Sequence, residues 1–346
     1  MRARDLGISI GTGTPGPLNA ITDVAGVRVG VTTLIEGAGV RTGVTVLVPP
    51  ALPLCAGCHR LNGNGELTGL EWIRENGFLT TPVAITNTHS VGVVRDALIA
   101  AEPPGPEEWS LPVVGETWDG WLNDINGFHV RPDHVHEALA GAGDGPVPEG
   151  NVGGGTGMIA HRFKGGTGTA SRVVAEADGG YTVGVLVQAN YGRRERLCVD
   201  GVPVGRLLPE AVVPDPYGGS RPGGSGSIIG IVATDAPLLP GQCDRLAQRA
   251  GLGVARMGGA GEDSSGDLFL CFATGNRFGV AQAALTAELE MLRQERIDPL
   301  FYAAIEATEE AILNALVAAE TLTGLDGHTA HALPHDLLVE AMSGSR

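Results

Sequence analysis

Residues 227–234 are the segment that most restricts how this chain can fold. Their sequence, Ser-Ile-Ile-Gly-Ile-Val-Ala-Thr, is apolar at nearly every position. A continuous apolar run of this kind predicts a strand buried on both faces, since a half-exposed strand would alternate apolar with polar residues. A Gly/Ser/Pro stretch over residues 217–226 precedes it and Asp-Ala-Pro ends it, which places Ser227 at the first position of the predicted strand.

The rest of the chain predicts more strands, followed by helices. Short β-branched runs bounded by Gly, Pro or Asn predict strands at residues 27–33, 43–48, 83–86 and 183–188. Helical spacing of apolar residues predicts helices at residues 71–75, 90–101, 133–140, 240–251 and 298–320. Strands and helices alternate in blocks, so we expect layered α/β or α+β packing. With 346 residues, 43% of them hydrophobic, the chain can build a sizeable core.

Charge and composition argue against two kinds of function. The formal net charge of −16 would repel a phosphate backbone, because nucleic-acid binding requires clustered Lys and Arg. Lys164 is the only lysine, so a Schiff-base mechanism would have one candidate and no neighbouring lysine to lower its pKa. We therefore expect neither a nucleic-acid partner nor catalysis by a lysine.

The sequence favours a cytoplasmic location. Residues 1–7 have the basic start of a secretory signal without an apolar stretch after it, and no run of about 18 apolar residues occurs. Five scattered cysteines, an odd number in a large chain, suit a reducing compartment better than a disulfide framework. These features predict a soluble cytoplasmic protein without a membrane partner.

The loop before residue 227 offers a specific chemistry. Pro-Gly-Gly-Ser-Gly-Ser, residues 222–227, places a flexible loop directly before a stiff strand, so the bond between Gly226 and Ser227 can be bent. Such a junction suits an N-to-O acyl shift, after which hydrolysis leaves Ser227 with a free α-amine. That amine, with a pKa near ~8, can serve as general base for its own hydroxyl. On these residues alone, an ordinary loop entering a strand is the more common explanation.

Two other places carry polar groups that could assist this chemistry. Ser264, Ser265 and Asp267 stand at the mouth of another apolar run, where hydroxyls and a carboxylate could orient an ammonium group. Asn190 lies just past a predicted strand, where an amide could donate to an oxyanion. A polar strand-entry turn and a turn asparagine would explain the same residues without any catalytic role.

Several competing motifs fail on their context. Residues 11–16 match the dinucleotide-binding glycine pattern, but no clear helix follows. Residues 55–59, Cys-Ala-Gly-Cys-His, match c-type haem attachment, which belongs to exported proteins. Histidines within 134–136 and 328–335 have no acidic partner at a recognisable metal-ligand spacing. We therefore predict no cofactor and no metal.

Longer motifs along nearly the whole chain resemble one known family. They occupy residues 21–30, 62–69, 86–96, 122–127, 153–158, 165–172, 187–192, 226–229, 233–240, 265–270 and 332–334. Examples are Asn-Gly-Asn-Gly-Glu-Leu-Thr-Gly at 62–69 and Gly-Gly-Thr-Gly-Thr-Ala-Ser-Arg at 165–172. In these motifs the chain resembles the L-aminopeptidase/D-esterase and β-peptidyl aminopeptidase group of self-processing N-terminal-nucleophile peptidases.

The resemblance implies a fold and an assembly. It implies an αββα four-layer sandwich, in which two central β-sheets are flanked by helices and the whole of residues 1–346 forms one domain. It implies processing into an α fragment, residues 1–226, and a β fragment, residues 227–346, commonly packed as a homotetramer of such pairs.

The resemblance also implies residue roles. Ser227 would be nucleophile and base after cleavage between Gly226 and Ser227. Ser265 and Asp267 would orient the free amine or the substrate ammonium, and Asn190 would supply an oxyanion-hole amide. The loops at residues 62–69 and 87–90, including Asn87 and His89, would line the substrate cleft.

One departure from the family pattern concerns two aromatic positions. The family usually reads Glu-Thr-Tyr-Asp-Gly-Tyr-Leu-Asn-Asp where residues 116–124 carry Trp118 and Trp121. Both phenols are replaced by indoles, which offer only an N–H donor. Substrate binding by Trp118 and Trp121 is one interpretation of this change, and simple packing of both indoles is the other.

The function implied is that of an aminopeptidase or amidase. It would release N-terminal residues from short peptides, amino-acid amides or esters through an acyl-enzyme on Ser227. One alternative is an acyltransferase of the ornithine-acetyltransferase kind. Those proteins use a threonine nucleophile, so the serine at position 227 argues against this alternative. Another is an uncleaved, non-catalytic binding protein, which the two lost tyrosines keep open.

Overall fold

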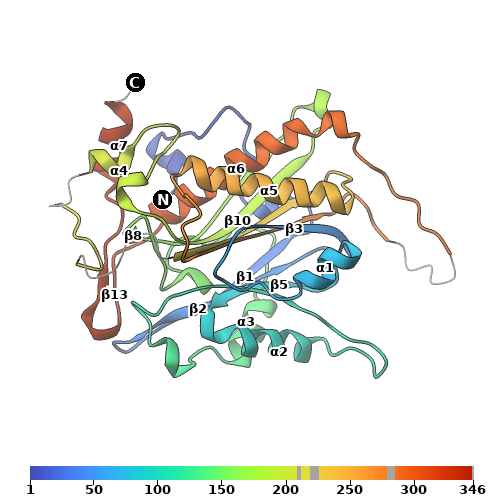
Figure 1. Cartoon of the computed structure of the whole chain (residues 1–346), viewed down its shortest axis with the longest axis horizontal. Helices are drawn as coiled ribbons and strands as arrows, with labels where there is room; N and C mark the ends of the chain where they lie inside the picture. Colours follow the sequence, from blue (N-terminus) through green and yellow to red (C-terminus); the bar gives the residue numbers. More distant parts are fainter. Residues whose placement is uncertain (209–211, 219–225, 279–284, 345–346) are drawn as a thin grey trace.

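Two β-sheets pack face to face and helices cover the outer side of each, giving four layers in the order αββα (Figure 1). The computed structural model describes residues 1–208, 212–218, 226–278 and 285–344. The layered α+β fold expected from the sequence is confirmed. Within the described ranges, no helix is both long enough and apolar enough to cross a membrane.

The larger sheet has six strands and contains the buried strand predicted at residues 227–234. In spatial order they are β4 (Phe78–Leu79), β3 (Leu54–Gly63), β12 (Ser265–Ala273), β11 (Gly226–Thr234), β10 (Thr182–Asn190) and β9 (Gly166–Val173). Only β11 and β12 run parallel to each other in this sheet. Its outer face is covered by α5 (Pro240–Arg256) and α6 (Asp298–Val317).

The smaller sheet has four strands and closes the other half of the sandwich. They are β1 (Arg28–Glu36), β2 (Val40–Val48), β5 (Val83–Asn87) and β6 (Val113–Thr117), in that spatial order. The pair β5 and β6 is parallel, so their carboxyl ends lie at one edge. The outer face carries α2 (Val91–Ala101) and α3 (Pro132–Ala140).

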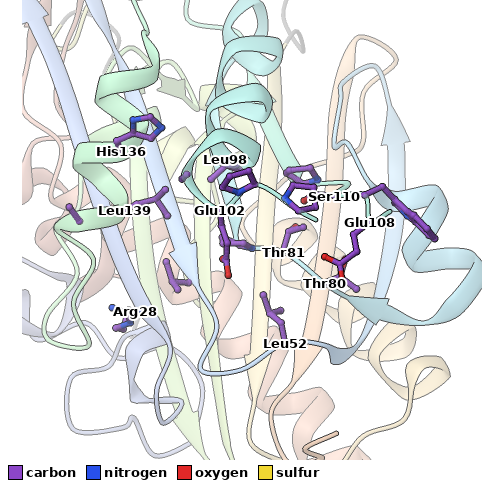
Figure 2. A pocket seen from close by; sticks show the side chains of 18 residues that line it. Arg28, Leu52, Thr80, Thr81, Leu98, Glu102, Glu108, Ser110, His136 and Leu139 are labelled. Atoms are coloured by element: carbon purple, nitrogen blue, oxygen red, sulfur yellow. The ribbon is translucent and has the colours of Figure 1, made fainter. Parts of the chain in front are cut away.

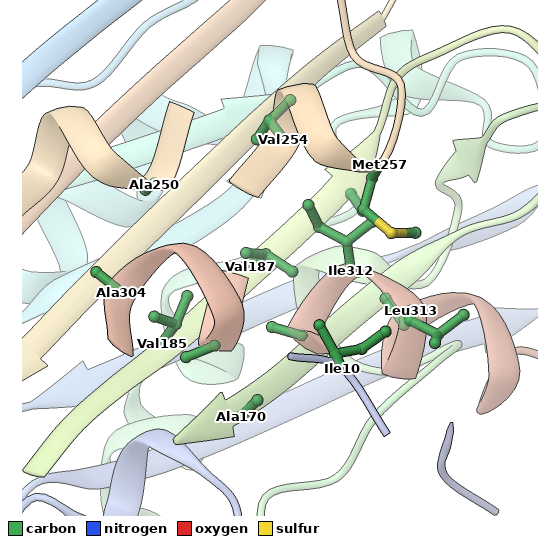
Figure 3. Close-up of a cluster of buried hydrophobic side chains, with 14 of the residues drawn as sticks. Ile10, Ala170, Val185, Val187, Ala250, Val254, Met257, Ala304, Ile312 and Leu313 are labelled. Atoms are coloured by element: carbon green, nitrogen blue, oxygen red, sulfur yellow. The ribbon is translucent and has the colours of Figure 1, made fainter. Parts of the chain in front are cut away.

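The continuous apolar pattern of β11 follows from its central position. Ile228 and Val232 pack into the core under α5 and α6, whereas Ile229 and Ile231 pack into the core between the sheets. All four are 0% exposed, and burying each contributes about 1.5–3 kcal/mol. Figure 3 shows part of the helix-side core, where side chains of β10 meet those of α6. Strand β11 is therefore a rigid support for the residue at its start.

Several element boundaries differ from the sequence-based predictions: α6 ends at Val317 instead of residue 320, and β1, β2 and β10 are longer than predicted. Two further differences concern β11 and α5. Strand β11 begins at Gly226, so Ser227 is its second residue instead of its first. Helix α5 continues past Gly251 to Arg256. Glycine often ends a helix, but here Gly253 lies where α5 crosses α6, and a Cβ on it would come 2.6 Å from Cβ of Thr308. Close helix packing, not helix termination, explains this glycine.

The remaining regular elements are short and connect the layers. They are α1 (Leu70–Asn76), α4 (Val204–Leu207), α7 (His335–Ser343), the hairpin β7 (Ile159–Ala160) and β8 (Phe163–Lys164), and the pair β13 (Leu322–Thr323) and β14 (Thr329–Ala330). The first hairpin lies beside the end of β10, because the amide of His161 donates to the carbonyl of Tyr191 at 2.7 Å.

Candidate active site

Ser227 stands where the two sheets meet at the start of β11. It pairs with Asn190 across the antiparallel ladder and with Gly266 across the parallel one. Directly opposed residues of an antiparallel pair point to the same face. The side chains of Ser227 and Asn190 therefore lie side by side on the face that carries Ile229, toward the smaller sheet.

Gly226 occupies a position where only glycine fits. A Cβ built on it would collide with the backbone oxygen of Asn190 and would lie 2.8 Å from Cα of Tyr191. Backbone atoms cannot move aside as a flexible side chain can. The residue before Ser227 is thus fixed as glycine by the close approach of β10.

A polar cavity of about 290 Å³ opens in front of Ser227. Its walls come from both sheets and from the loops between them, and the lining residues are Asn64, Thr88, Glu116, Trp118, Gly226, Ser227 and Ser264. Most of these residues carry a hydroxyl, amide or carboxylate. The cavity lies at the carboxyl ends of β5 and β6, because Thr88 follows β5, and Glu116 and Trp118 end or follow β6.

Glu116 is the carboxylate that lines this cavity. One of its oxygens accepts a hydrogen bond from the amide of Glu66 at 2.9 Å, and the other accepts from the hydroxyl of Thr88. Burial raises the pKa of Glu116, while these two donors act in the opposite direction. The side chain is 3% exposed. A buried carboxylate held by two donors is well suited to receive a cation.

The Asn190 amide is fixed at both ends. Its Oδ1 accepts from the amide of Ile159 at 2.8 Å, and its Nδ2 donates to the carbonyl of Trp118 at 2.9 Å. The accepting role toward Ile159 determines which end is oxygen. An asparagine amide has a second N–H, and the strand pairing places the Asn190 side chain on the same face of the sheet as that of Ser227.

Ser265 and Asp267 form a tight pair on the other face of the same sheet. The Ser265 hydroxyl donates to Asp267 Oδ1 at 2.6 Å. Burial raises the pKa of Asp267 to about 6, against hydrogen bonds from Ser265 and the Ile228 amide. Ser265 is the register partner of Gly226, so it flanks the Gly226–Ser227 bond.

The Ser265–Asp267 pair does not line the cavity in front of Ser227. It borders a separate cavity of only about 10 Å³, shared with Tyr191, Gly261 and Glu262 among others. From the sequence, Ser265 and Asp267 were predicted to orient either the free amine of Ser227 or the ammonium group of the substrate. Their place beside the backbone nitrogen of Ser227 suits the first of these roles. Glu116, which was not among the candidates singled out from the sequence, occupies the place that suits a substrate cation.

The four predicted substrate-binding residues have different environments. Trp118 lines the Ser227 cavity. Trp121 instead stacks on His328, with ring centroids 3.8 Å apart, and donates to the carbonyl of Pro216 at 3.1 Å. Asn87 is buried and its side-chain oxygen accepts from the His89 amide at 3.0 Å. His89 is exposed, and its ring stacks on that of Phe128 with centroids 6.2 Å apart. The geometry therefore places Trp118 at the cavity, and Trp121 fits the packing interpretation.

Glu116 left a weak signal in the sequence. It ends the run Val-Val-Gly-Glu over residues 113–116, which is too short to indicate a strand by itself. Strand β6 forms because the run pairs with β5 and is buried on both faces. The features that could have indicated Glu116 are its place at the end of this apolar run and at the start of the family motif over residues 116–124.

A larger cavity, about 820 Å³, lies elsewhere (Figure 2). It opens at the amino ends of β5 and β6, next to Pro82 and Pro112, and is bordered by residues of α2 and α3 such as Leu98 and Leu139. Its charged lining residues are Arg28, Glu102 and Glu108. Ser227 and the other candidate catalytic residues are absent from its walls.

Metal binding has no visible basis in the part of the chain that the structure describes. There, no group of three or more His, Cys, Asp or Glu side chains is arranged to hold an ion. His328 stacks on Trp121, and His335 contacts the carbonyl of Val317 at 2.8 Å.

Comparisons with known proteins identify the family of this chain. The sequence pattern described as peptidase family S58 matches residues 19–330. A β-peptidyl aminopeptidase, BapA, from Sphingosinicella microcystinivorans is 51% identical over 96% of this chain and 90% of the relative. BapA from Sphingosinicella xenopeptidilytica is 45% identical over 99% and 90%.

Solved structures give the same result. A β-aminopeptidase from a Burkholderia species has a TM-score of 0.92 and 56% identity, covering 99% of both chains. The L-aminopeptidase D-Ala-esterase/amidase of Ochrobactrum anthropi, described as a variant of the Ntn-hydrolase fold, has a TM-score of 0.90 and 43% identity, covering 99% of this chain and 98% of that one. This chain therefore belongs to peptidase family S58 and is an aminopeptidase of the N-terminal-nucleophile class.

Proposed function

We propose that the chain cuts itself between Gly226 and Ser227, and that the product works as an aminopeptidase on short peptides through the new N-terminal Ser227. The observation that carries this proposal is the position of Ser227, the second residue of the rigid strand β11, at the wall of a polar cavity. Cleavage gives fragments of residues 1–226 and 227–346. For this chain, the relatives named β-peptidyl aminopeptidase and β-aminopeptidase favour substrates with N-terminal β-amino acids. The relative named L-aminopeptidase D-Ala-esterase/amidase adds amino-acid amides and esters.

Self-cleavage begins with the Ser227 hydroxyl. Its oxygen attacks the carbonyl carbon of Gly226, the C–N bond breaks, and the nitrogen takes up a proton to become the free α-amine. Water then hydrolyses the resulting ester and regenerates the hydroxyl. Ser265 flanks this bond as the register partner of Gly226, so its hydroxyl is placed to interact with the leaving nitrogen.

Turnover uses the amine as the base. With an ordinary pKa of about 7.7–8.0, a neutral Ser227 amine accepts the hydroxyl proton while the oxygen attacks the substrate carbonyl. The proton passes to the leaving amine, and water releases the acyl group by the reverse sequence. The Ser265–Asp267 pair, bonded at 2.6 Å, orients the Ser227 amine.

Asn190 stabilises the oxyanion. Its Nδ2 is held on the same face as the Ser227 side chain by the β10–β11 register, and the N–H that does not bond Trp118 is directed to the developing charge. One such donor is typically worth about 3–4 kcal/mol.

Glu116 recognises the free amine of the substrate. It is the carboxylate of the cavity, and its oxygens are fixed by the Glu66 amide and the Thr88 hydroxyl. A cavity of about 290 Å³ holds one residue and the start of the next, which restricts the enzyme to N-terminal residues. The extra backbone carbon of a β-amino acid moves the amine farther from the carbonyl, which suits a carboxylate across the cavity from Ser227.

We further propose a homotetramer of processed pairs in the cytoplasm. All five cysteines are free in the described structure, which suits a reducing compartment. Light scattering of the processed protein tests the assembly, and a mass of a single pair would contradict it.

Denaturing mass spectrometry tests the central proposal. Cleavage gives two species, of 226 and 120 residues, the second starting with Ser227. One intact 35.5 kDa species in an active preparation would overturn it. Hydrolysis of β-alanyl and α-alanyl amides, with and without N-acetylation, then tests the requirement for a free amine.

A further inference from the structure

Lys164, the single lysine of the chain, is completely buried next to the candidate active site. It lies in β8, and its Nζ donates to the carbonyl oxygens of Met158 and Gly165, both at 2.8 Å, and of Gly155 at 3.4 Å. An ammonium group has three donors. All three are used to hold carbonyls of one loop, residues 155–165.

This cation is unusual for its lack of an anionic partner. Among the described residues no Asp or Glu pairs with Lys164, and burial lowers its pKa to about 7. The buried Arg172, by contrast, pairs with Glu306 and Glu310. Burial without a counter-ion disfavours the charged form, so the carbonyls of Gly155, Met158 and Gly165 are the groups that stabilise Nζ in this site.

One peptide unit connects Lys164 to the oxyanion amide. The unit between Met158 and Ile159 offers its C=O to Lys164 Nζ at 2.8 Å and to the Gly165 amide at 2.9 Å, and its N–H to Asn190 Oδ1 at 2.8 Å. A peptide unit is planar and rigid, so fixing its carbonyl also fixes the direction of its N–H. Asn190 in turn donates to Trp118 O at 2.9 Å.

We propose that Lys164 is a positioning residue for Asn190: by holding the Met158 carbonyl, it sets the Ile159 N–H that orients the oxyanion-hole amide. This inference rests on the proposed oxyanion role of Asn190. Lys164 itself touches neither the substrate nor Ser227. Its effect should therefore appear in kcat, through transition-state stabilisation, and not in KM.

A double-mutant cycle of Lys164→Met and Asn190→Ala on an aminoacyl amide tests the inference. Asn190→Ala should lower kcat about 10²–10³-fold. Lys164→Met should lower kcat about tenfold with KM within about twofold, and the double variant should be no slower than Asn190→Ala, since both changes remove one effect. The inference is overturned if the fold-losses of kcat in the two single variants multiply in the double variant, or if Lys164→Met leaves kcat unchanged.

Hydrogen exchange gives a readout that does not depend on activity. The Ile159 amide should exchange at least about tenfold faster in Lys164→Met. Thr308→Val is the matched control, because it removes a buried hydroxyl that donates to a backbone carbonyl in α6, at 2.7 Å from Ala304 O. It should leave both kcat and the Ile159 exchange rate unchanged, and equal exchange rates in the two variants would contradict the proposal.

Two outcomes separate this inference from the proposed function. If Asn190→Ala keeps full kcat, the oxyanion assignment fails, and the inference fails with it. If Asn190→Ala loses kcat but Lys164→Met changes neither kcat nor Ile159 exchange, only the inference fails. Should Lys164→Met not fold, Lys164→Gln, which keeps two N–H donors without the charge, replaces it under the same criteria, with a smaller loss of kcat expected.

Discussion

Two cavities lie at opposite ends of the parallel pair β5 and β6, and they differ in both size and chemistry. The cavity at the amino ends, about 820 Å³, is bordered by prolines and leucines, and its charged side chains lie at exposed positions (Figure 2). The cavity at the carboxyl ends, about 290 Å³, contains Ser227 and the buried carboxylate of Glu116. We assign catalysis to the smaller one.

The difference shows that size is a poor guide to the site in this fold. Carboxyl ends of parallel strands commonly carry the functional loops of layered proteins. Here the end of β6 supplies Glu116, the turn after β5 supplies Thr88, and the second sheet brings Ser227 from across the interface. Each prediction below contrasts a change at the smaller cavity, or at Asp267 near Ser227, with a matched change at the larger cavity or outside all of these places.

The largest effect is expected from removing the nucleophile. Ser227→Ala should leave the chain uncut and lower kcat on the order of 10⁶-fold, as loss of a catalytic serine does elsewhere. Ser110→Ala, a hydroxyl at the larger cavity, is the control and should cleave and turn over normally. Denaturing mass spectrometry measures self-cleavage, and amide hydrolysis measures turnover. If the Ser227→Ala protein were still cleaved, Ser227 would not be the nucleophile of self-cleavage.

Neutralising the carboxylate of the smaller cavity comes next. Glu116→Gln should lower kcat/KM about 10²-fold, close to 3 kcal/mol, because the substrate ammonium loses its charged partner. Since burial raises the pKa of Glu116, wild-type KM should increase as pH falls through that raised pKa, and this dependence should vanish in Glu116→Gln.

Glu108→Gln at the larger cavity is the matched control. It should change kcat/KM by less than about twofold. If Glu116→Gln and Glu108→Gln lowered kcat/KM equally, the assignment of substrate binding to the smaller cavity would be wrong.

Asp267→Asn is expected to lower activity moderately and to raise stability. Asp267→Asn should lower kcat about tenfold, because an amide orients Ser265 less well than a carboxylate does. Burial raises the pKa of Asp267 from 3.8 to about 6, so the native state binds more protons than the unfolded state between these pH values. Stability from this group is therefore lost as pH rises through that window.

Urea unfolding measures the consequence of this shift. At pH 8 the Asp267→Asn variant should be more stable than wild type by up to about 3 kcal/mol, from a shift of about two pKa units. The gain should disappear at pH 4, where wild-type Asp267 is largely protonated. Asp263→Asn, an exposed neighbour, should show no gain at either pH, and a pH-independent gain at Asp267 would contradict the linkage.

The smallest effect is expected at the larger cavity. Trp109 is 70% exposed on its rim, so Trp109→Ala should change kcat/KM on aminoacyl amides by less than about twofold. Trp118→Ala, at the smaller cavity, is the paired change and should alter KM. A larger effect from Trp109 than from Trp118 would mean that the larger cavity takes part in binding substrate.

Much of the fold could be predicted from local pattern. The run at residues 227–234 indicated a strand covered on both faces because no polar residue interrupts it, and helical spacing indicated α5 and α6. The end of α5 could not be predicted, since Gly253 is explained by its contact with Thr308 of α6, a residue far away in the sequence. Strand β6 was missed because its five residues gain their shape only by pairing with β5.

Some residues of the candidate site could likewise be predicted from the sequence, and others could not. The glycine-rich loop before Ser227 and the family motifs pointed to Ser227, Asn190, Ser265 and Asp267 from the sequence alone. The sequence did not reveal that Ser265 and Asp267 occupy the opposite face of the sheet from the Ser227 cavity, because that depends on the strand register. Nor did it single out Glu116, which reaches the site only when the smaller sheet packs on the larger.

By itself, then, the sequence determined many of the helices and strands and the candidate nucleophile, because hydrophobic pattern and loop composition act locally along the chain. The tertiary structure alone decided which polar groups share a cavity with Ser227 and which residues hold them. That decision depends on sheet packing, which brings Glu116 and Ser227 into one cavity, and on strand register, which pairs Asn190 with Ser227. Lys164 is the clearest example, because the sequence shows only a single lysine, whereas the structure shows which backbone carbonyls accept hydrogen bonds from it.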